Sequence, residues 1–308
     1  MLIEKILPRL RNEYECCSLC LRKCGVNRAE GEKGFCRAPA NPVVYRYAPH
    51  HGEEPPLSGA NGSGTIFFSC CSMKCVYCQN YRFSQLDEGK EISCEALSGM
   101  MLELQEKGCH NINLVNPTHF VPSIVEALKV AYSRGLNIPL VYNTGGYGSL
   151  HVIQALDGII DIYLPDMRYS QEGEAGKYSS APGYVANNRA IVKEMYKQVG
   201  NLETSRGIAS KGLIVRLLVL AGGISGTIET LEFIAKELGR DVCLSVMSQY
   251  YPAYKAADYK ELSRRISRDE YHAVLDKMSE LGLRNGWVQP FEGGFDEGLA
   301  GENLPPSI

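Results

Sequence analysis

The sequence predicts an α/β protein in which a parallel sheet is surrounded by helices. From about residue 65 onward, short β-branched or apolar runs alternate with longer segments of helical periodicity, and this alternation occurs six times. A chain of 308 residues, 44% of them hydrophobic, can bury a core of the required size. Repeated strand–helix units favour a (β/α)6 barrel or part of one, while a doubly wound open sheet is the layout that periodicity alone leaves open.

The predicted elements alternate regularly along the chain. The six strands are expected at 65–69, 111–115, 138–143, 160–164, 213–220 and 242–247. The helices space their apolar residues three or four apart, several end at glycine, and they are expected at 92–108, 118–135, 149–156, 187–200, 227–239 and 267–282. In either layout ligands bind beyond the carboxyl ends of the strands, where the loops that follow them gather.

Two regions fall outside this repeat. Residues 1–60 contain five cysteines and many turn residues, which predicts a small Cys-rich N-terminal lobe before a core of residues 61–290. Residues 291–308 carry four acidic residues, no basic one, and much Gly and Pro, which predicts a flexible acidic tail.

Composition also limits the location and the partners. The first fifteen residues contain no continuous apolar stretch of the kind a signal peptide needs, and the longest apolar run is interrupted by Arg216. We therefore expect a cytoplasmic protein without a membrane partner. The net charge is −3, and the basic residues form no stripe, so a nucleic-acid partner is not expected.

The segment SCCSMKCVYCQNY, residues 69–81, directly follows the first predicted strand. In a reducing compartment such clustered cysteines indicate metal binding or catalysis more often than disulfides. Cys71, Cys75 and Cys78 give the spacing Cys-x3-Cys-x2-Cys, which can wrap one face of an iron–sulfur cube, whereas a filled cubane site takes four cysteines. One iron is then left open, as in reactive rather than structural metal sites. Packed thiols without metal are the alternative.

A second cysteine group lies in the predicted N-terminal lobe. Its members would form a four-ligand set for a tetrahedral zinc ion or an auxiliary iron–sulfur cluster, with thiols that hold no metal as the alternative. They are Cys17, Cys20, Cys24 and Cys36. No barrel strand precedes this group, so we expect the primary site at residues 71–78.

The spacing of the first group resembles the signature of the radical S-adenosylmethionine superfamily, in which an aromatic residue, here Tyr77, often precedes the last cysteine. With Gln79 and Asn80 after that cysteine, the chain looks most like the group related to pyruvate formate-lyase activating enzyme, over about residues 17 to 290. The resemblance implies a [4Fe–4S] cluster on Cys71, Cys75 and Cys78 that reductively cleaves S-adenosylmethionine. The resulting 5′-deoxyadenosyl radical would abstract a substrate hydrogen.

The same resemblance suggests which other residues contact the cofactor. Residues 116–119 stand where relatives often have Gly-Gly-Glu, residues 143–145 resemble a Thr-Asn-Gly region, and Asp166-Met167-Arg168 resembles Asp-x-Lys. An arginine offers the cofactor carboxylate a planar fork rather than a point charge, and Arg216 offers a second one. An ordinary ion pair between Asp166 and Arg168 is the alternative. The implied cofactor-binding residues are Tyr77, Asn80, Asn116, Asn143, Asp166 and Arg168.

The implied activity is that of a glycyl-radical-enzyme activase, which takes a Cα hydrogen from a glycine of a partner enzyme. It would receive one electron from a flavodoxin or ferredoxin type donor. A radical enzyme acting on a small molecule or modified peptide is the alternative, and a non-catalytic iron–sulfur or zinc protein is the second. Residues 50–54, His-His-Gly-Glu-Glu, indicate either a metal or acid/base site or a Pro-flanked polar loop. Residues 170–188 lie where a substrate loop is expected.

Overall fold

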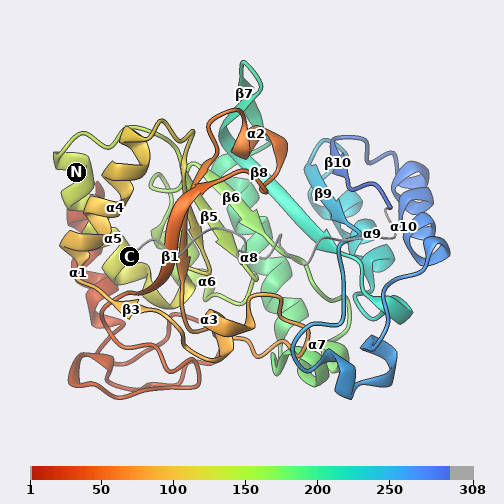
Figure 1. Ribbon diagram of the computed structural model, residues 1–308, viewed down its shortest axis with the longest axis horizontal. Coiled ribbons are helices and arrows are strands. Elements are labelled where there is room, and N and C mark those ends of the chain that lie inside the picture. The colour runs from red at the N-terminus through yellow and green to blue at the C-terminus, as the bar shows by residue number, and fades with distance from the viewer. Residues whose placement is uncertain (1, 292–308) are drawn as a thin grey trace.

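The computed structural model describes residues 2–291 and contains a ten-stranded, mostly parallel sheet surrounded by helices (Figure 1). Seven strands run parallel to their neighbours. They are β2 (Ser63–Phe68), β4 (Ile112–Val115), β5 (Leu140–Thr144), β6 (Ile162–Pro165), β8 (Ile208–Leu218), β9 (Cys243–Met247) and β10 (Gly286–Val288). The first six overlap the six predicted strands, and β10 is a short addition at the end of the sheet.

The strand order decides between the two layouts that periodicity left open. The sheet reads β10-β9-β8-β6-β5-β4-β2-β1-β3, so each parallel strand lies beside the next one along the chain. A doubly wound sheet would instead reverse its order at a switch point. The two ends of the described sheet, β10 and β3, pair only with β9 and β1. The fold is therefore a partial barrel, as predicted.

The helices that follow the strands occupy the predicted positions. They are α4 (Cys94–Glu106), α5 (Val121–Ser133), α6 (Leu150–Ala155), α8 (Tyr184–Val199), α9 (Thr227–Glu237) and α10 (Arg268–Leu281). Local sequence sets several of their ends, because Ser93 and Ser267 accept hydrogen bonds from backbone N–H groups in the first turns of α4 and α10. Each helix also buries an apolar face.

Four helices were not predicted. They are α1 (Leu2–Asn12), α2 (Pro55–Ser58), α3 (Tyr81–Gln85) and α7 (Glu172–Ser179). In α1, Ile3, Leu7 and Leu10 are buried at spacings of four and three, and α1 packs against α5, so its helical period was present in the sequence. Short 3-10 turns lie at Arg28–Glu30, Thr118–Phe120, Ala221–Gly223, Ala256–Asp258 and Lys260–Leu262.

Part of the predicted N-terminal lobe extends the core sheet. Strand β1 (Val43–His50) pairs antiparallel with β2, and β3 (Lys90–Glu91) pairs with β1. Strand β7 (Glu203–Ser205) forms an antiparallel ribbon with β8. The predicted acidic tail lies, apart from Phe291, outside the described residues. Within residues 2–291, every helix is too short or too polar to cross a membrane.

The barrel interior changes character along its axis. At the end where α2 lies, Leu57 packs with Val141, Ile162, Ile214 and Cys243 in a buried apolar cluster. Side chains two residues further along a strand face the same way, so Asn143, Arg216 and Ser245 continue this interior surface toward the carboxyl ends. In Figure 1, α2 lies at the top, while α3 and α7 lie at the opposite end. The interior thus contains an apolar cluster near the α2 end and polar side chains toward the carboxyl ends of the strands.

Candidate functional site

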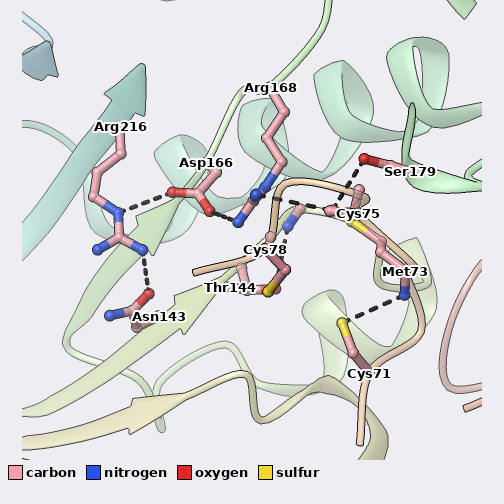
Figure 2. A network of polar contacts seen from close by, with 12 residues as sticks. Cys71, Met73, Cys75, Cys78, Asn143, Thr144, Asp166, Arg168, Ser179 and Arg216 are labelled. Atoms are coloured by element: carbon pink, nitrogen blue, oxygen red, sulfur yellow. Dashed lines mark hydrogen bonds and ion pairs between the residues drawn. The ribbon is translucent and has the colours of Figure 1, made fainter. Parts of the chain in front are cut away.

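The loop that follows β2 carries Cys71, Cys75 and Cys78 at the carboxyl end of the barrel, as Figure 2 shows. Cys75 is buried, and the other two are partly exposed. The three thiols lie close enough to affect one another, because negative charge at Cys75 raises the pKa of both Cys71 and Cys78. The sequence spacing therefore corresponds to a real gathering of thiols on the expected face.

Backbone hydrogen bonds from two distant segments hold this loop. The N–H groups of Lys74 and Val76 donate to the carbonyls of Ser179 and Tyr178, at 2.9 and 2.8 Å. The Lys255 N–H donates to the Val76 carbonyl at 2.8 Å. The segment 170–188, predicted as a substrate loop, thus contains α7 and clamps the cysteine loop.

Hydrogen-bond donors surround the sulfur atoms. The Ser179 hydroxyl donates to Cys75 Sγ at 3.0 Å, and the Met73 N–H donates to Cys71 Sγ at 3.4 Å. The Ser84 hydroxyl lies 3.2 Å from Cys78 Sγ. Such contacts orient ligands and tune the potentials of iron–sulfur clusters. Sequence reasoning missed Ser179, since 104 residues separate it from Cys75, and Ser84 carries no motif.

The environment of Cys71 and Cys78 favours their protonated thiol forms. Burial raises the pKa of Cys71 to about 12, with a further contribution from Cys75. Burial likewise raises the pKa of Cys78 to about 11. Metal binding at these thiols would therefore release protons and become more favourable as the pH rises.

A cluster rather than a single ion fits this donor set. Within residues 2–291, no three Cys, His, Asp or Glu side chains are arranged to hold one metal ion. In an iron–sulfur cube each thiolate binds a different iron, so the ligands lie further apart than around one ion. Three thiols whose sulfurs have hydrogen-bonding neighbours are a suitable donor set for such a cluster. The assignment of Cys71, Cys75 and Cys78 as ligands stays a prediction.

Cys70, which precedes the predicted ligands, lies at a backbone turn. Its φ of +68° lies in the left-handed region, which favours glycine. Its side chain is buried, and its N–H donates to the Phe83 carbonyl at 2.8 Å. Asn116, also with positive φ, donates its side-chain amide to the Cys70 carbonyl at 2.5 Å. In the structure, the predicted cofactor contact Asn116 thus supports the start of the loop.

A buried charge network borders the thiols (Figure 2). The Asp166 carboxylate accepts hydrogen bonds from Arg216 at 2.9 Å and from Arg168 at 2.5 Å. Arg216 also donates to Asn143 Oδ1 at 2.5 Å, and Arg168 Nη1 points at Cys75 Sγ from 3.9 Å. Burial raises the pKa of Asp166, but the two guanidiniums outweigh burial and hold that pKa below its ordinary value. Asp166 and Arg168 therefore form more than a strand-end ion pair, because Arg216 and Asn143 join them from neighbouring strands.

A pocket brings most of the predicted cofactor-binding residues together. It is lined by Tyr77, Cys78, Gln79, Asn80, Asp166, Arg168, Arg216, Leu218, Met247 and Gln249. The Tyr77 hydroxyl lies 2.8 Å from that of Tyr169, and its ring packs edge-on against Tyr250. Asn143 reaches the pocket through its contact with Arg216. A polar cavity of two guanidiniums and one carboxylate beside a thiol suits a ligand with both an anionic and a cationic group.

The four predicted ligands of the N-terminal region differ in their exposure. Cys17, Cys20 and Cys36 are buried, and Cys24 is exposed. Burial raises the pKa of Cys20 to about 12, and the other three cysteines contribute weakly to that rise. The four side chains are near one another without the arrangement that one ion requires. A second metal there stays a prediction. All twelve cysteines of the chain are unpaired in the structure.

Comparison with known proteins supports the fold. No family model matches the chain. The uncharacterized protein MJ0674 of Methanocaldococcus jannaschii is 29% identical over 285 residues, which cover 89% of this chain and 77% of that protein. Streptococcus suis SuiB bound to S-adenosylmethionine aligns over 71% of this chain and 48% of its own, with a TM-score of 0.50 and 11% identity. SuiB bound to its precursor peptide SuiA gives the same TM-score.

The chain therefore spans about half the length of the SuiB chains that it matches. At this level of identity the likeness concerns the fold. It confirms the predicted α/β partial barrel.

Proposed function

We propose that this protein is a radical S-adenosylmethionine enzyme. The observation that carries the proposal is the gathering of Cys71, Cys75 and Cys78 at the carboxyl end of β2, beside the pocket with Asp166, Arg168 and Arg216. When bound, a reduced [4Fe–4S] cluster and S-adenosylmethionine supply one electron and a carbon–sulfur bond whose cleavage yields a 5′-deoxyadenosyl radical for hydrogen abstraction. SuiB, a protein of the same fold, has been solved with S-adenosylmethionine bound.

The chain's own residues have distinct roles in this proposal. Cys71, Cys75 and Cys78 hold the cluster, while the Ser179 hydroxyl donates a hydrogen bond to the Cys75 sulfur and orients it. Arg168 and Arg216 attract the cofactor carboxylate. Asp166 holds both guanidiniums in place, since it bonds each of them within 2.9 Å. The Nε of Arg168 is buried and has no hydrogen-bond partner, so this guanidinium retains a donor for a ligand.

Anaerobic reconstitution tests this proposal. The reconstituted, reduced protein should give a [4Fe–4S] electron paramagnetic resonance signal that changes when S-adenosylmethionine is added, and it should release 5′-deoxyadenosine. An unchanged signal together with no cofactor cleavage would overturn the proposal. That result would leave a non-catalytic iron–sulfur or zinc protein as the better description.

The finer proposal is a glycyl-radical-enzyme activase, which rests on the sequence resemblance of residues 71–81. Its partners would be a flavodoxin or ferredoxin type electron donor and a glycyl-radical enzyme as protein substrate. Mixing the loaded protein with a glycyl-radical enzyme encoded nearby should produce a glycyl radical signal. If none forms while 5′-deoxyadenosine is still released, the substrate is instead a small molecule or a modified peptide.

A further inference from the structure

Two glutamates enter the barrel from the end opposite the cysteine loop. Glu53 and Glu54 lie between β1 and α2, and their exposed fractions are 9% for the Glu53 side chain and 8% for Glu54. Glu53 Oε2 lies 3.5 Å from Arg216 Nη1, on the far side of that guanidinium from the pocket carboxylate Asp166. The segment predicted as a metal site, an acid/base site or a polar loop thus contributes buried carboxylates to the barrel interior.

The hydrogen bonds of this interior are incomplete. Asn113, on β4, is fully buried, and neither its amide nitrogen nor its amide oxygen has a hydrogen-bond partner. Oε2 of Glu54 is buried and also unpaired. Burial raises the pKa of Glu53, and Arg216, Asn113 and Glu54 each lower it in part, so these three groups lie close to the Glu53 carboxyl. A buried polar group without a partner destabilises the fold, so these unpaired atoms around Glu53 indicate a missing ligand.

The charged groups of the interior indicate that the missing ligand carries a positive charge. Glu53, Glu54 and Asp166 supply three carboxylates, whereas Arg168 and Arg216 supply two guanidiniums, and both of these already bond Asp166. Burial raises the pKa of both glutamates, and the Arg216 guanidinium offsets that rise only in part. A group that carries one positive charge and several N–H donors would complete both the charge balance and the hydrogen bonds.

We propose that Glu53, Glu54 and Asn113 form a subsite for an ammonium or guanidinium group of the substrate. This inference rests on the proposed function, because it places the substrate in the barrel beneath the pocket where the radical would form. The carboxylate oxygens and the Asn113 amide oxygen accept hydrogen bonds from the cation. Arg216 separates this subsite from the pocket, so the cofactor and the cationic group would bind on opposite sides of one guanidinium.

Probe binding tests the subsite. Isothermal titration calorimetry of the cluster-loaded protein, saturated with S-adenosylmethionine, would compare n-butylammonium and n-butylguanidinium with n-butanol. At least one cation should bind ten or more times more tightly than the alcohol. Acetyl-Gly-Lys-Gly-amide tests whether the cationic group belongs to a peptide or to a small molecule. Tighter binding of this peptide than of n-butylammonium would indicate a peptide side chain. Equal binding of cations and alcohol would overturn the inference.

Variants connect that binding to the named residues. Glu54→Gln and Asn113→Leu should each weaken cation binding at least tenfold, whereas Glu106→Gln, which changes an exposed residue on α4, should not. Unweakened binding in both folded variants would contradict the assignment; if neither folds, the wild-type probe comparison decides. Release of 5′-deoxyadenosine by the wild type separates the two proposals. Cofactor cleavage without selective cation binding removes only the subsite, and absence of cleavage removes the proposed function.

Discussion

The two cysteine groups of this chain have similar spacing but different surroundings. Cys71, Cys75 and Cys78 follow a barrel strand, their loop is clamped by Ser179, Tyr178 and Lys255, and their sulfurs accept hydrogen bonds. The N-terminal group follows α1 and a turn, and one of its four cysteines, Cys24, is exposed. The spacing of cysteines in the sequence identifies thiols that could bind one metal centre together. The surroundings differ in the hydrogen bonds that orient the sulfurs and hold the loop.

The N-terminal region nevertheless supports the cysteine loop. Arg22 Nε donates to the Ser72 carbonyl at 2.7 Å. Buried Arg28 donates to the His119 carbonyl at 2.6 Å, and the His119 ring lies 2.7 Å from the Ser69 carbonyl, just before the loop. Because that carbonyl can only accept, His119 Nε2 carries the hydrogen. His119 thus packs as a structural residue, and the two regions are mechanically connected.

The largest expected effect separates the two adjacent cysteines of the loop. Cys71→Ala should abolish the [4Fe–4S] signal and all release of 5′-deoxyadenosine, because it removes one of three ligands. Cys70→Ala should keep both, since Cys70 serves a backbone turn. Iron analysis and electron paramagnetic resonance measure the outcome. The reverse pattern would mean that the ligand register is displaced by one residue.

Removing Arg216 should have the next largest effect. Arg216→Met leaves Asp166 with one guanidinium and Glu53 with none, and unpairing such a buried charge costs about 3 kcal/mol. The unfolding free energy, from denaturant titration, should fall by that amount, and S-adenosylmethionine should bind more weakly. Arg240→Met, which changes an exposed arginine, provides the control. Equal stability of the two variants would argue against the buried network.

Acid should weaken the contact that supports the loop. Burial lowers the pKa of His119 from 6.5 to about 3, so the unfolded chain binds its proton more readily than the folded chain does. The stability from neutral His119 is complete above pH 6.5 and is lost as the pH falls toward about 3. His119→Gln keeps an N–H donor but does not titrate. Its unfolding free energy should therefore fall less steeply with decreasing pH than that of the wild type, by about 1 kcal/mol per pH unit. If the pH dependence of the unfolding free energy is unchanged in this variant, other titrating groups determine the acid sensitivity.

The smallest expected effect on the cluster concerns the N-terminal cysteines. Cys17→Ala should keep the cluster signal and the cofactor cleavage, because Cys17 has no hydrogen bond to the cysteine loop. Metal analysis of the two proteins then decides the second site. A loss of zinc or iron relative to the wild type would assign a metal to Cys17, Cys20, Cys24 and Cys36, whereas equal contents would show packed thiols.

Much of the fold could be predicted because periodicity is a local property. The six core strands and the helices that follow them are visible as alternating apolar patterns, and the helix α1 was missed although its period is present. The order of the strands could not be predicted, since strand pairing joins segments far apart in the chain. Short helices such as α7 were missed because packing on the cysteine loop, rather than propensity, stabilises them.

The sequence by itself determined the cysteine spacing, its position after the first core strand, and the residues that end the following strands. These features depend on neighbours within a few positions, so they can be read along the chain. Only the tertiary structure decided that Ser179 reaches Cys75, that Arg216 joins Asp166 to Glu53, and that Asn113 is buried without a partner. The physical reason is that burial and hydrogen bonding depend on distance in space, which closing the barrel sets.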